Sequence, residues 1–366
     1  MIDKNKVVIP ERFKDHPIFN ELLCGTNFGF MAKRGYYTTP EAKKQPEIMR
    51  KTGINWTTLN MNFCQTRYYS DKVYLDFEYS TGELELADMV KRLHDNGIKV
   101  LFKPCLTSLD GAWMGVVKFP TKDTLLQIQG VDNDYWGKWS KSFIEAEKYF
   151  ADFAERIGID SMIIGAEYFG TEGQNDMWLK VIEEVRKLYN GPITYEFTPD
   201  SRKVYDLKWF DDLDFLSYSY YPPAVPFTPE QVSSIEAVRA TPDYTLDQMI
   251  EHLSKRKPRI ESISERFGNK PIAFTEYGVR SAHGCIMRPY DISWDTPYDG
   301  KQQADFMEAS FRTFWDLPQW MGFFWWKWDE TQDRPHYAGD PNGERGFTIQ
   351  GKPAEEVMKR WIQKNK

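Results

Sequence analysis

The chain has 366 residues, of which 41% are hydrophobic and 16% aromatic, and its formal net charge is −7. The aromatic content excludes a largely disordered chain, and the excess of acidic side chains argues against a partner that is a nucleic acid. No apolar run approaches the roughly 20 residues of a membrane-spanning helix, so no membrane partner is expected either.

Short runs of β-branched and aromatic residues alternate with amphipathic helical segments, which is typical of repeated strand–helix units. The clearest helix is expected over residues 136–157, where apolar side chains recur every three or four positions, and the weakest over residues 201–210. The expected strands cover residues 22–30, 54–63, 98–106, 161–167, 193–198, 214–221, 272–276 and 321–328.

Eight such units fit one α/β domain, a single (β/α)₈ TIM barrel, better than two domains. We expect this barrel over residues 21–366, preceded by an N-terminal extension over the charged residues 1–20. Long loops are expected after the third, sixth and seventh strands, over residues 107–135, 222–243 and 280–300. In such a barrel these loops gather at the carboxyl ends of the strands, where active sites are built.

Metal and redox chemistry have little support in the sequence. The 4 cysteines and 5 histidines are scattered, without the spacing of a zinc site or a disulfide framework. We therefore expect no metal and no other cofactor. The first residues lack the apolar segment of a secretory signal, so we expect a cytoplasmic location, and the sequence indicates no particular oligomeric state.

Two glutamates supply the main chemical signal. Glu167 and Glu276 each end an apolar strand, the fourth and the seventh of the repeat, and inward side chains there would face each other across the barrel mouth. A retaining glycosidase needs two carboxyl groups about 5–5.5 Å apart, and an inverting one needs about 6.5–9.5 Å. A single strand-end glutamate is more often a cap or a surface ion pair, but the paired placement favours catalysis. Asp214 and Glu196 are weaker candidates, because Asp214 opens its strand and alternation leaves the facing of Glu196 open.

Aromatic side chains near the strand ends supply the second signal, because a ring can cover the apolar face of a sugar. Trp326 and Trp328 end the eighth strand, Trp113 lies in the loop after the third, and Tyr220 and Tyr221 end the sixth. We expect all five to contact substrate. The competing interpretation is that they pack between the helices and the barrel.

Polar side chains near other strand ends are candidates for binding sugar hydroxyls. They are Asn60 after the second strand, Lys103 after the third and Arg280 after Glu276. Tyr221 is also well placed to hydrogen-bond Glu276 and hold its rotamer. Each has a structural alternative, since polar side chains at strand ends often satisfy loop backbone.

Several stretches carry a resemblance to a known family, and they span nearly the whole chain. They are Lys103-Pro104, Asp110-Gly111-Ala112-Trp113, Ile164-Gly165-Ala166-Glu167, Ser219-Tyr220-Tyr221-Pro222, Thr275-Glu276-Tyr277-Gly278-Val279-Arg280-Ser281, Arg288-Pro289-Tyr290-Asp291, Gln303-Ala304-Asp305 and Phe324-Trp325-Trp326-Lys327-Trp328. On these motifs the sequence resembles glycoside hydrolase family 113, a β-mannanase family in the clan of retaining glycosidases built on (β/α)₈ barrels.

The resemblance implies a retaining, endo-acting hydrolase of β-1,4-mannosidic bonds in mannan or manno-oligosaccharides. Glu167 would be the acid/base, Glu276 the nucleophile, and no cofactor would be needed. Many members of the clan carry Asn before the acid/base to contact the sugar 2-hydroxyl, whereas this chain has Ala166. Two alternatives stay open: an exo-acting β-mannosidase or β-glucosidase of the same clan, and a carbohydrate-binding barrel without catalysis.

Overall fold

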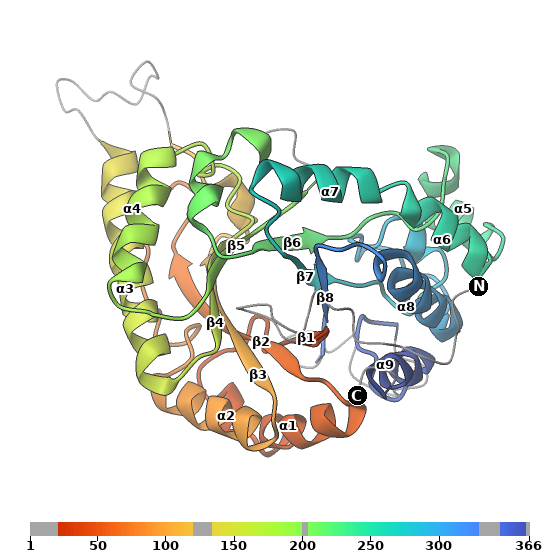
Figure 1. Ribbon diagram of the computed structural model, residues 1–366, viewed down its shortest axis with the longest axis horizontal. Coiled ribbons are helices and arrows are strands. Elements are labelled where there is room, and N and C mark those ends of the chain that lie inside the picture. The colour runs from red at the N-terminus through yellow and green to blue at the C-terminus, as the bar shows by residue number, and fades with distance from the viewer. Residues whose placement is uncertain (1–20, 120–133, 200–203, 329–344, 364–366) are drawn as a thin grey trace.

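A closed barrel of eight parallel strands forms the centre of the computed structural model, which describes residues 21–119, 134–199, 204–328 and 345–363 (Figure 1). Each strand pairs with the next in chain order, and β8 pairs with β1 to close the barrel. The predicted (β/α)₈ fold is therefore confirmed. The predicted N-terminal extension, residues 1–20, lies outside the described residues.

The eight strands lie close to their predicted positions. They are β1 (Leu23–Phe28), β2 (Trp56–Gln65), β3 (Lys99–Ser108), β4 (Ser161–Ala166), β5 (Ile193–Phe197), β6 (Leu216–Tyr220), β7 (Ile272–Tyr277) and β8 (Trp320–Trp325). β8 ends at Trp325, earlier than the predicted end at Trp328. Beyond it, Trp326 N–H donates to the carbonyl of Tyr277 on β7, and Trp328 N–H donates to that of Asn27 on β1. The peptide bond between Trp326 and Lys327 is cis.

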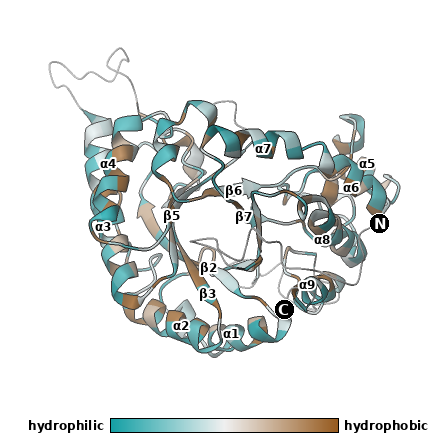
Figure 2. Cartoon of the chain, viewed as in Figure 1, coloured by the Kyte–Doolittle hydropathy of each residue, from teal (hydrophilic) through white to brown (hydrophobic). Residues whose placement is uncertain are grey.

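Helices surround the barrel and bury one face against it. The α-helices of the described residues are α1 (Pro40–Thr52), α2 (Glu83–Asp95), α3 (Tyr135–Ile157), α4 (Asn175–Arg186), α5 (Ile235–Arg239), α6 (Leu246–Ser254), α7 (Lys257–Arg266), α8 (Gly300–Phe314) and α9 (Pro353–Gln363). Figure 2 shows this pattern as helices with hydrophilic outer surfaces around more hydrophobic strands. Within the described ranges, no helix has both the length and the apolar character to cross a membrane.

The segment between β5 and β6 differs from the prediction. Its described residues form the short 3-10 helices η4 (Val204–Asp206) and η5 (Lys208–Asp212) instead of an α-helix over residues 201–210. Val204, Leu207 and Phe210 are all buried and recur at every third position. That spacing matches the three residues per turn of a 3-10 helix, so the apolar pattern favours the tighter form.

The connections after β3, β6 and β7 are long, as the sequence indicates. Part of the first, residues 120–133, is outside the description, and the second contains α5 and the 3-10 helix η6 (Glu230–Val232). The third contains η7 (Cys285–Met287). The connections after β2 and β8, residues 66–82 and 326–352, are also long, and the sequence analysis did not single them out.

Candidate active site

The ends of β4, β5, β7 and β8 bring the candidate side chains together. Glu167 directly follows β4, with a backbone φ of 57°, which is the left-handed region that residues with a side chain rarely adopt. Its N–H donates to the carbonyl of Glu196 on β5 at 2.9 Å. At Gly278, directly after β7, an added Cβ would lie 2.5 Å from the carbonyl oxygen of Trp326, so glycine allows the ends of β7 and β8 to approach.

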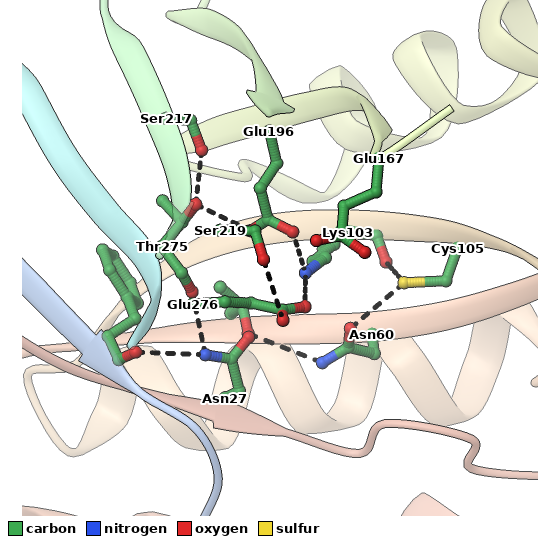
Figure 3. Close-up of polar contacts among 12 residues, drawn as sticks. Asn27, Asn60, Lys103, Cys105, Glu167, Glu196, Ser217, Ser219, Thr275 and Glu276 are labelled. Atoms are coloured by element: carbon green, nitrogen blue, oxygen red, sulfur yellow. Dashed lines mark hydrogen bonds and ion pairs between the residues drawn. The ribbon is translucent and has the colours of Figure 1, made fainter. Parts of the chain in front are cut away.

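Lys103, Glu196 and Glu276 form a buried group that we call the charged cluster (Figure 3). The Lys103 Nζ lies 2.6 Å from Glu196 Oε1 and 2.5 Å from Glu276 Oε1. The side chains of Lys103 and Glu196 are 1% and 0% exposed, and that of Glu276 is 13% exposed. Burial alone would lower the pKa of Lys103, but the two carboxylates outweigh it and raise that pKa above its ordinary value, so the ammonium stays charged.

Glu196 is fully paired within the barrel. Its second oxygen, Oε2, accepts a hydrogen bond from Thr275 Oγ1 at 2.6 Å, and the Thr275 hydroxyl in turn contacts that of Ser217. Burial raises the pKa of Glu196 to about 8, and the neighbouring charge of Glu276 adds to this while Lys103 and Thr275 oppose it. Among the described residues, the polar partners of the Glu196 side chain are thus side chains of the barrel interior, whereas Glu276 keeps some exposure at the mouth.

The other oxygen of Glu276 faces β6 and its end. Tyr221 OH donates to Glu276 Oε2 at 2.9 Å, and Ser219 Oγ lies 3.5 Å from the same atom. Burial, followed by the charge of Glu276, raises the pKa of the Tyr221 hydroxyl well above its ordinary value, so it remains a donor. Both oxygens of Glu276 are thus held by donors, and its orientation is fixed.

Glu167 shares neighbours with Glu276 but has a different electrostatic environment. Trp113 Nε1 donates to Glu167 Oε2 at 3.1 Å, and Ser219, which contacts Glu276 Oε2, also acts to lower the pKa of Glu167. Burial, and next the negative charge of Glu276, raise the pKa of Glu167 above its ordinary value. One carboxyl group that tends to keep its proton therefore lies in the same cluster as one that is paired with an ammonium.

Two further predicted residues lie at this cluster. The Lys103 Nζ is 5.6 Å from the centre of the Trp326 ring, and that ring packs edge-on against Phe30 at 4.6 Å. Asn60 is opposite Lys103 in the β2–β3 register, and its side chain donates to the carbonyl of Phe28 and accepts from the Cys105 thiol. Asn60 is 0% exposed, so these contacts are internal to the barrel.

The remaining predicted binding residues have contacts in other parts of the structure. Tyr220 packs against the rings of Phe274 and Tyr277. Trp328 is 0% exposed and donates from Nε1 to Gln45 on α1. Arg280 is buried, and its guanidinium donates to the carbonyls of loop residues Ile292, Trp294 and Arg345.

From the sequence, Glu196 is a weaker candidate than the two strand-end glutamates, yet its carboxyl group contacts Lys103 in the charged cluster (Figure 3). A signal for it does exist in the sequence. Glu196 is the one acid in the run Ile193–Phe197, and Lys103 lies in the largely apolar strand β3. Opposite charges placed in the interior strands of one barrel must find each other, because an unpaired buried charge is costly.

One group in the described part of the chain has the arrangement of possible metal ligands. Asp243, His283 and Asp299 each place a ligand atom within 4.8 Å of the others. They belong to the loops after β6 and β7, and Asp299 also caps α8 by accepting from Gln302 N–H. The Asp243 side chain is 90% exposed, as is common for surface acids that hold no ion.

Comparison with known proteins gives a consistent result. The model of Glycoside Hydrolase Family 113 matches residues 26–352. A solved family-113 β-mannanase from Alicyclobacillus acidocaldarius has a TM-score of 0.76 and 25% identity, covering 94% of this chain and 97% of that one. A family-5 mannosidase from Rhizomucor miehei shares the fold alone, with a TM-score of 0.62 and 13% identity over 98% of this chain and 97% of that one.

A short match to a curated protein is also found. A β-glucuronidase from Streptococcus agalactiae is 26% identical over 102 residues, which is 27% of this chain. The match covers 16% of that relative, so this chain corresponds to a small part of its length.

Proposed function

The chain belongs to glycoside hydrolase family 113, and on that premise we propose that it cleaves β-1,4-mannosidic bonds in mannan or manno-oligosaccharides with retention of configuration. The family makes it a glycoside hydrolase with a carbohydrate substrate. The choice of mannose is supported by the solved family-113 relatives, which are β-mannanases. The observation that carries the mechanism is that Glu167 and Glu276 lie in one cluster of side chains at the barrel mouth while their partners differ: Glu276 is paired with Lys103, and Glu167 accepts from Trp113.

In the first step, an oxygen of Glu276 forms a bond to the anomeric carbon while the glycosidic C–O bond breaks. The leaving oxygen takes the proton of Glu167, whose raised pKa keeps that proton available. Lys103 and Tyr221 keep Glu276 oriented for attack. The product of this step is a glycosyl ester of Glu276 with a free leaving hydroxyl.

In the second step, water forms a bond to the anomeric carbon while the ester C–O bond breaks, and Glu167 takes the proton of the water. The change of role follows from electrostatics. The charge of Glu276 is one cause of the raised pKa of Glu167, and esterification removes that charge. The pKa of Glu167 then falls, and the carboxylate can act as a base.

Trp113 and Trp326 are the aromatic side chains that we assign to substrate contact. Trp113 is 49% exposed and hydrogen-bonded to Glu167, and the Trp326 ring lies beside the ammonium of Lys103. Their rings are suited to the apolar faces of the sugars on either side of the cleaved bond. Tyr220, Trp328 and Arg280 have the internal contacts described above, and we assign them to the support of the site.

The test uses the purified chain with manno-, gluco- and xylo-oligosaccharides, with products sized and the first anomer identified by proton NMR. We expect cleavage of mannohexaose into shorter oligosaccharides, with the β-anomer formed first. Release of single mannose units from one end would instead indicate the exo-acting β-mannosidase alternative. Formation of the α-anomer first would contradict retention, and cleavage of only the gluco or xylo series would contradict the sugar assignment.

A further inference from the structure

The charged cluster contains one ammonium and two carboxylates, although a retaining mechanism consumes only one of them. Resting on the proposed function, we propose that Glu196 is the counter-ion of Lys103 in the glycosyl ester, a positioning residue that keeps the buried ammonium paired while Glu276 is esterified. Glu196 acts through Lys103, because its side chain is 0% exposed and both its oxygens are taken by Lys103 and Thr275.

The charge balance of the two steps shows why a second carboxylate is needed. In the resting enzyme Lys103 contacts Oε1 of Glu276 and Oε1 of Glu196. When Glu276 forms its bond to the anomeric carbon, it becomes a neutral ester, and the proton of Glu167 leaves with the departing hydroxyl. Without Glu196, the ammonium of Lys103 would then be buried with no carboxylate in direct contact, which is strongly unfavourable.

The groups that face Lys103 from neighbouring elements cannot replace Glu196. The Trp326 ring contributes only a cation–π contact at 5.6 Å. Burial raises the pKa of the Cys105 thiol to about 12, so this neighbour on β3 is neutral. Glu167 interacts with Lys103 electrostatically, but the ion pairs of Lys103 within the described residues are those with Glu196 and Glu276.

The titration of Glu196 agrees with this role. The charge of Glu276 is one of the causes that raise the pKa of Glu196, and esterification of Glu276 removes it. The pKa of Glu196 then falls, which favours its anionic form at the moment when Lys103 depends on it. In the second step the ester bond breaks, Glu276 regains its charge, and the original arrangement returns.

The test is Glu196→Gln, which keeps the shape of the side chain and removes its charge. Loss of the counter-ion should disfavour formation of the glycosyl ester but not its hydrolysis, because hydrolysis restores the pairing between Glu276 and Lys103. With a 2,4-dinitrophenyl glycoside of the preferred sugar, kcat/KM reports the first step, and kcat reports the second wherever a burst of the phenol precedes the steady state. We expect kcat/KM to fall about 100-fold or more and kcat to be unchanged or higher.

Ser217→Ala is the matched control, since it removes a hydroxyl from the same buried network without changing any charge. A purely structural role of Glu196 would lower kcat and kcat/KM together in both variants. That result, or an unchanged kcat/KM in Glu196→Gln, would overturn the proposal. The selective loss of kcat/KM in Glu196→Gln alone supports it.

A double variant keeps the test decisive if Glu196→Gln folds poorly. In a Lys103→Met background no ammonium is left to pair, so adding Glu196→Gln should change kcat/KM by no more than about threefold. A further large loss in Lys103→Met/Glu196→Gln would contradict the counter-ion role.

Failure of the proposed function gives a different result. If Glu276→Ala still hydrolyses the aryl glycoside at the normal rate, the retaining mechanism itself is wrong. If Glu276→Ala is inactive while Glu196→Gln behaves like the original enzyme, only the role of Glu196 is wrong.

Discussion

Two regions of this protein bury a glutamate completely, and they treat it in opposite ways. Glu196, at the carboxyl ends of the barrel strands, accepts from Lys103 and Thr275. Glu147 lies on the inner face of α3, between Phe143 and Phe150, and is 1% exposed. Neither oxygen of Glu147 has a hydrogen-bond partner among the described residues.

Burial raises the pKa of both groups, so a raised pKa alone does not distinguish them. The difference lies in the groups that converge on each carboxyl. At the barrel mouth an ammonium, hydroxyl groups and two further carboxyl groups meet, and proton transfer between neighbours is possible. Glu147 lies on the buried face of α3 with the side chains of Phe143 and Phe150, and burial there favours its neutral form. A buried acid therefore indicates a reactive site only where other polar groups surround it.

The strongest test of this comparison removes Glu276, the proposed nucleophile. Glu276→Ala should lower kcat by about 10⁴-fold or more, because no other side chain in the cluster can form the glycosyl ester. Added azide should restore turnover and give the α-glycosyl azide, identified by NMR. The paired variant Glu147→Gln should keep normal kcat, since that carboxyl lies in the helix interface. Normal turnover by Glu276→Ala would remove the distinction between the two regions.

The next largest effect is expected at Glu167, the proposed acid/base. Glu167→Ala should lower kcat/KM on oligosaccharides by about 10²–10⁴-fold, the usual contribution of a general acid. A 2,4-dinitrophenyl glycoside has a leaving group that needs no proton, so its first step should be far less affected. Pre-steady-state release of the phenol measures that step. Equal losses on both substrates would show that Glu167 does not supply the proton.

A smaller effect is expected from the hydroxyl that holds Glu276. Tyr221→Phe removes the 2.9 Å hydrogen bond to Oε2, and loss of a bond to a charged group should lower kcat/KM about 10- to 100-fold. Tyr220→Phe is the matched control, because the adjacent ring packs against Phe274 and Tyr277. Steady-state kinetics give kcat/KM for both variants. A comparable loss in Tyr220→Phe would indicate a packing effect.

Replacement of Trp113 tests how the pKa of Glu167 controls the reaction. Its N–H donates to the carboxylate of Glu167, which favours the ionised form and lowers the pKa of that group, opposing the effect of burial. Trp113→Phe should therefore raise that pKa and move the basic limb of the kcat/KM profile to higher pH. The control is Trp315→Phe, which replaces a tryptophan that packs against Trp361. A basic limb that stays in place, or moves to lower pH, would contradict the assignment.

Much of the fold and the two principal glutamates could be predicted because their signals are local. Apolar runs that alternate with amphipathic segments give the strands and helices, and Glu167 and Glu276 each lie at the end of such a run. Placement of both at the same barrel mouth follows from the topology alone. The hydrogen bond from Tyr221 to Glu276 was predicted on the same basis, since neighbouring strands end together.

The partners inside the barrel could not be predicted, because they depend on contacts between strands that are not neighbours in the sheet. Lys103 on β3 reaches Glu196 on β5 and Glu276 on β7 only after the barrel closes. Arg280 follows Glu276 in the sequence, yet its guanidinium donates hydrogen bonds to backbone carbonyls of the loop after β7. Trp328 was expected at the mouth, but the earlier end of β8 leaves its indole bonded to Gln45.

The last expected effect concerns the other region, and it changes stability instead of rate. In the folded protein burial raises the pKa of Glu147 well above its ordinary value of 4.5. Below that ordinary value both folded and unfolded chains carry the proton. As the pH rises above it, the unfolded chain ionises and is stabilised while the folded chain is not. This group therefore lowers the free energy of unfolding by up to about 1.4 kcal/mol per pH unit until the raised pKa is reached.

Glu147→Gln removes the titrating proton, so the variant should gain stability relative to the original chain as the pH rises from about 5 to 8. Denaturant unfolding at several pH values measures the difference in the free energy of unfolding between the two chains. The change of this difference with pH is independent of any constant effect of the buried amide. Glu145→Gln is the control, because Glu145 lies on the same helix with its side chain 63% exposed. If the difference for Glu147→Gln does not change with pH, Glu147 ionises equally in both states. It must then have a charged or polar partner in the folded protein, and the contrast between the two regions would not hold.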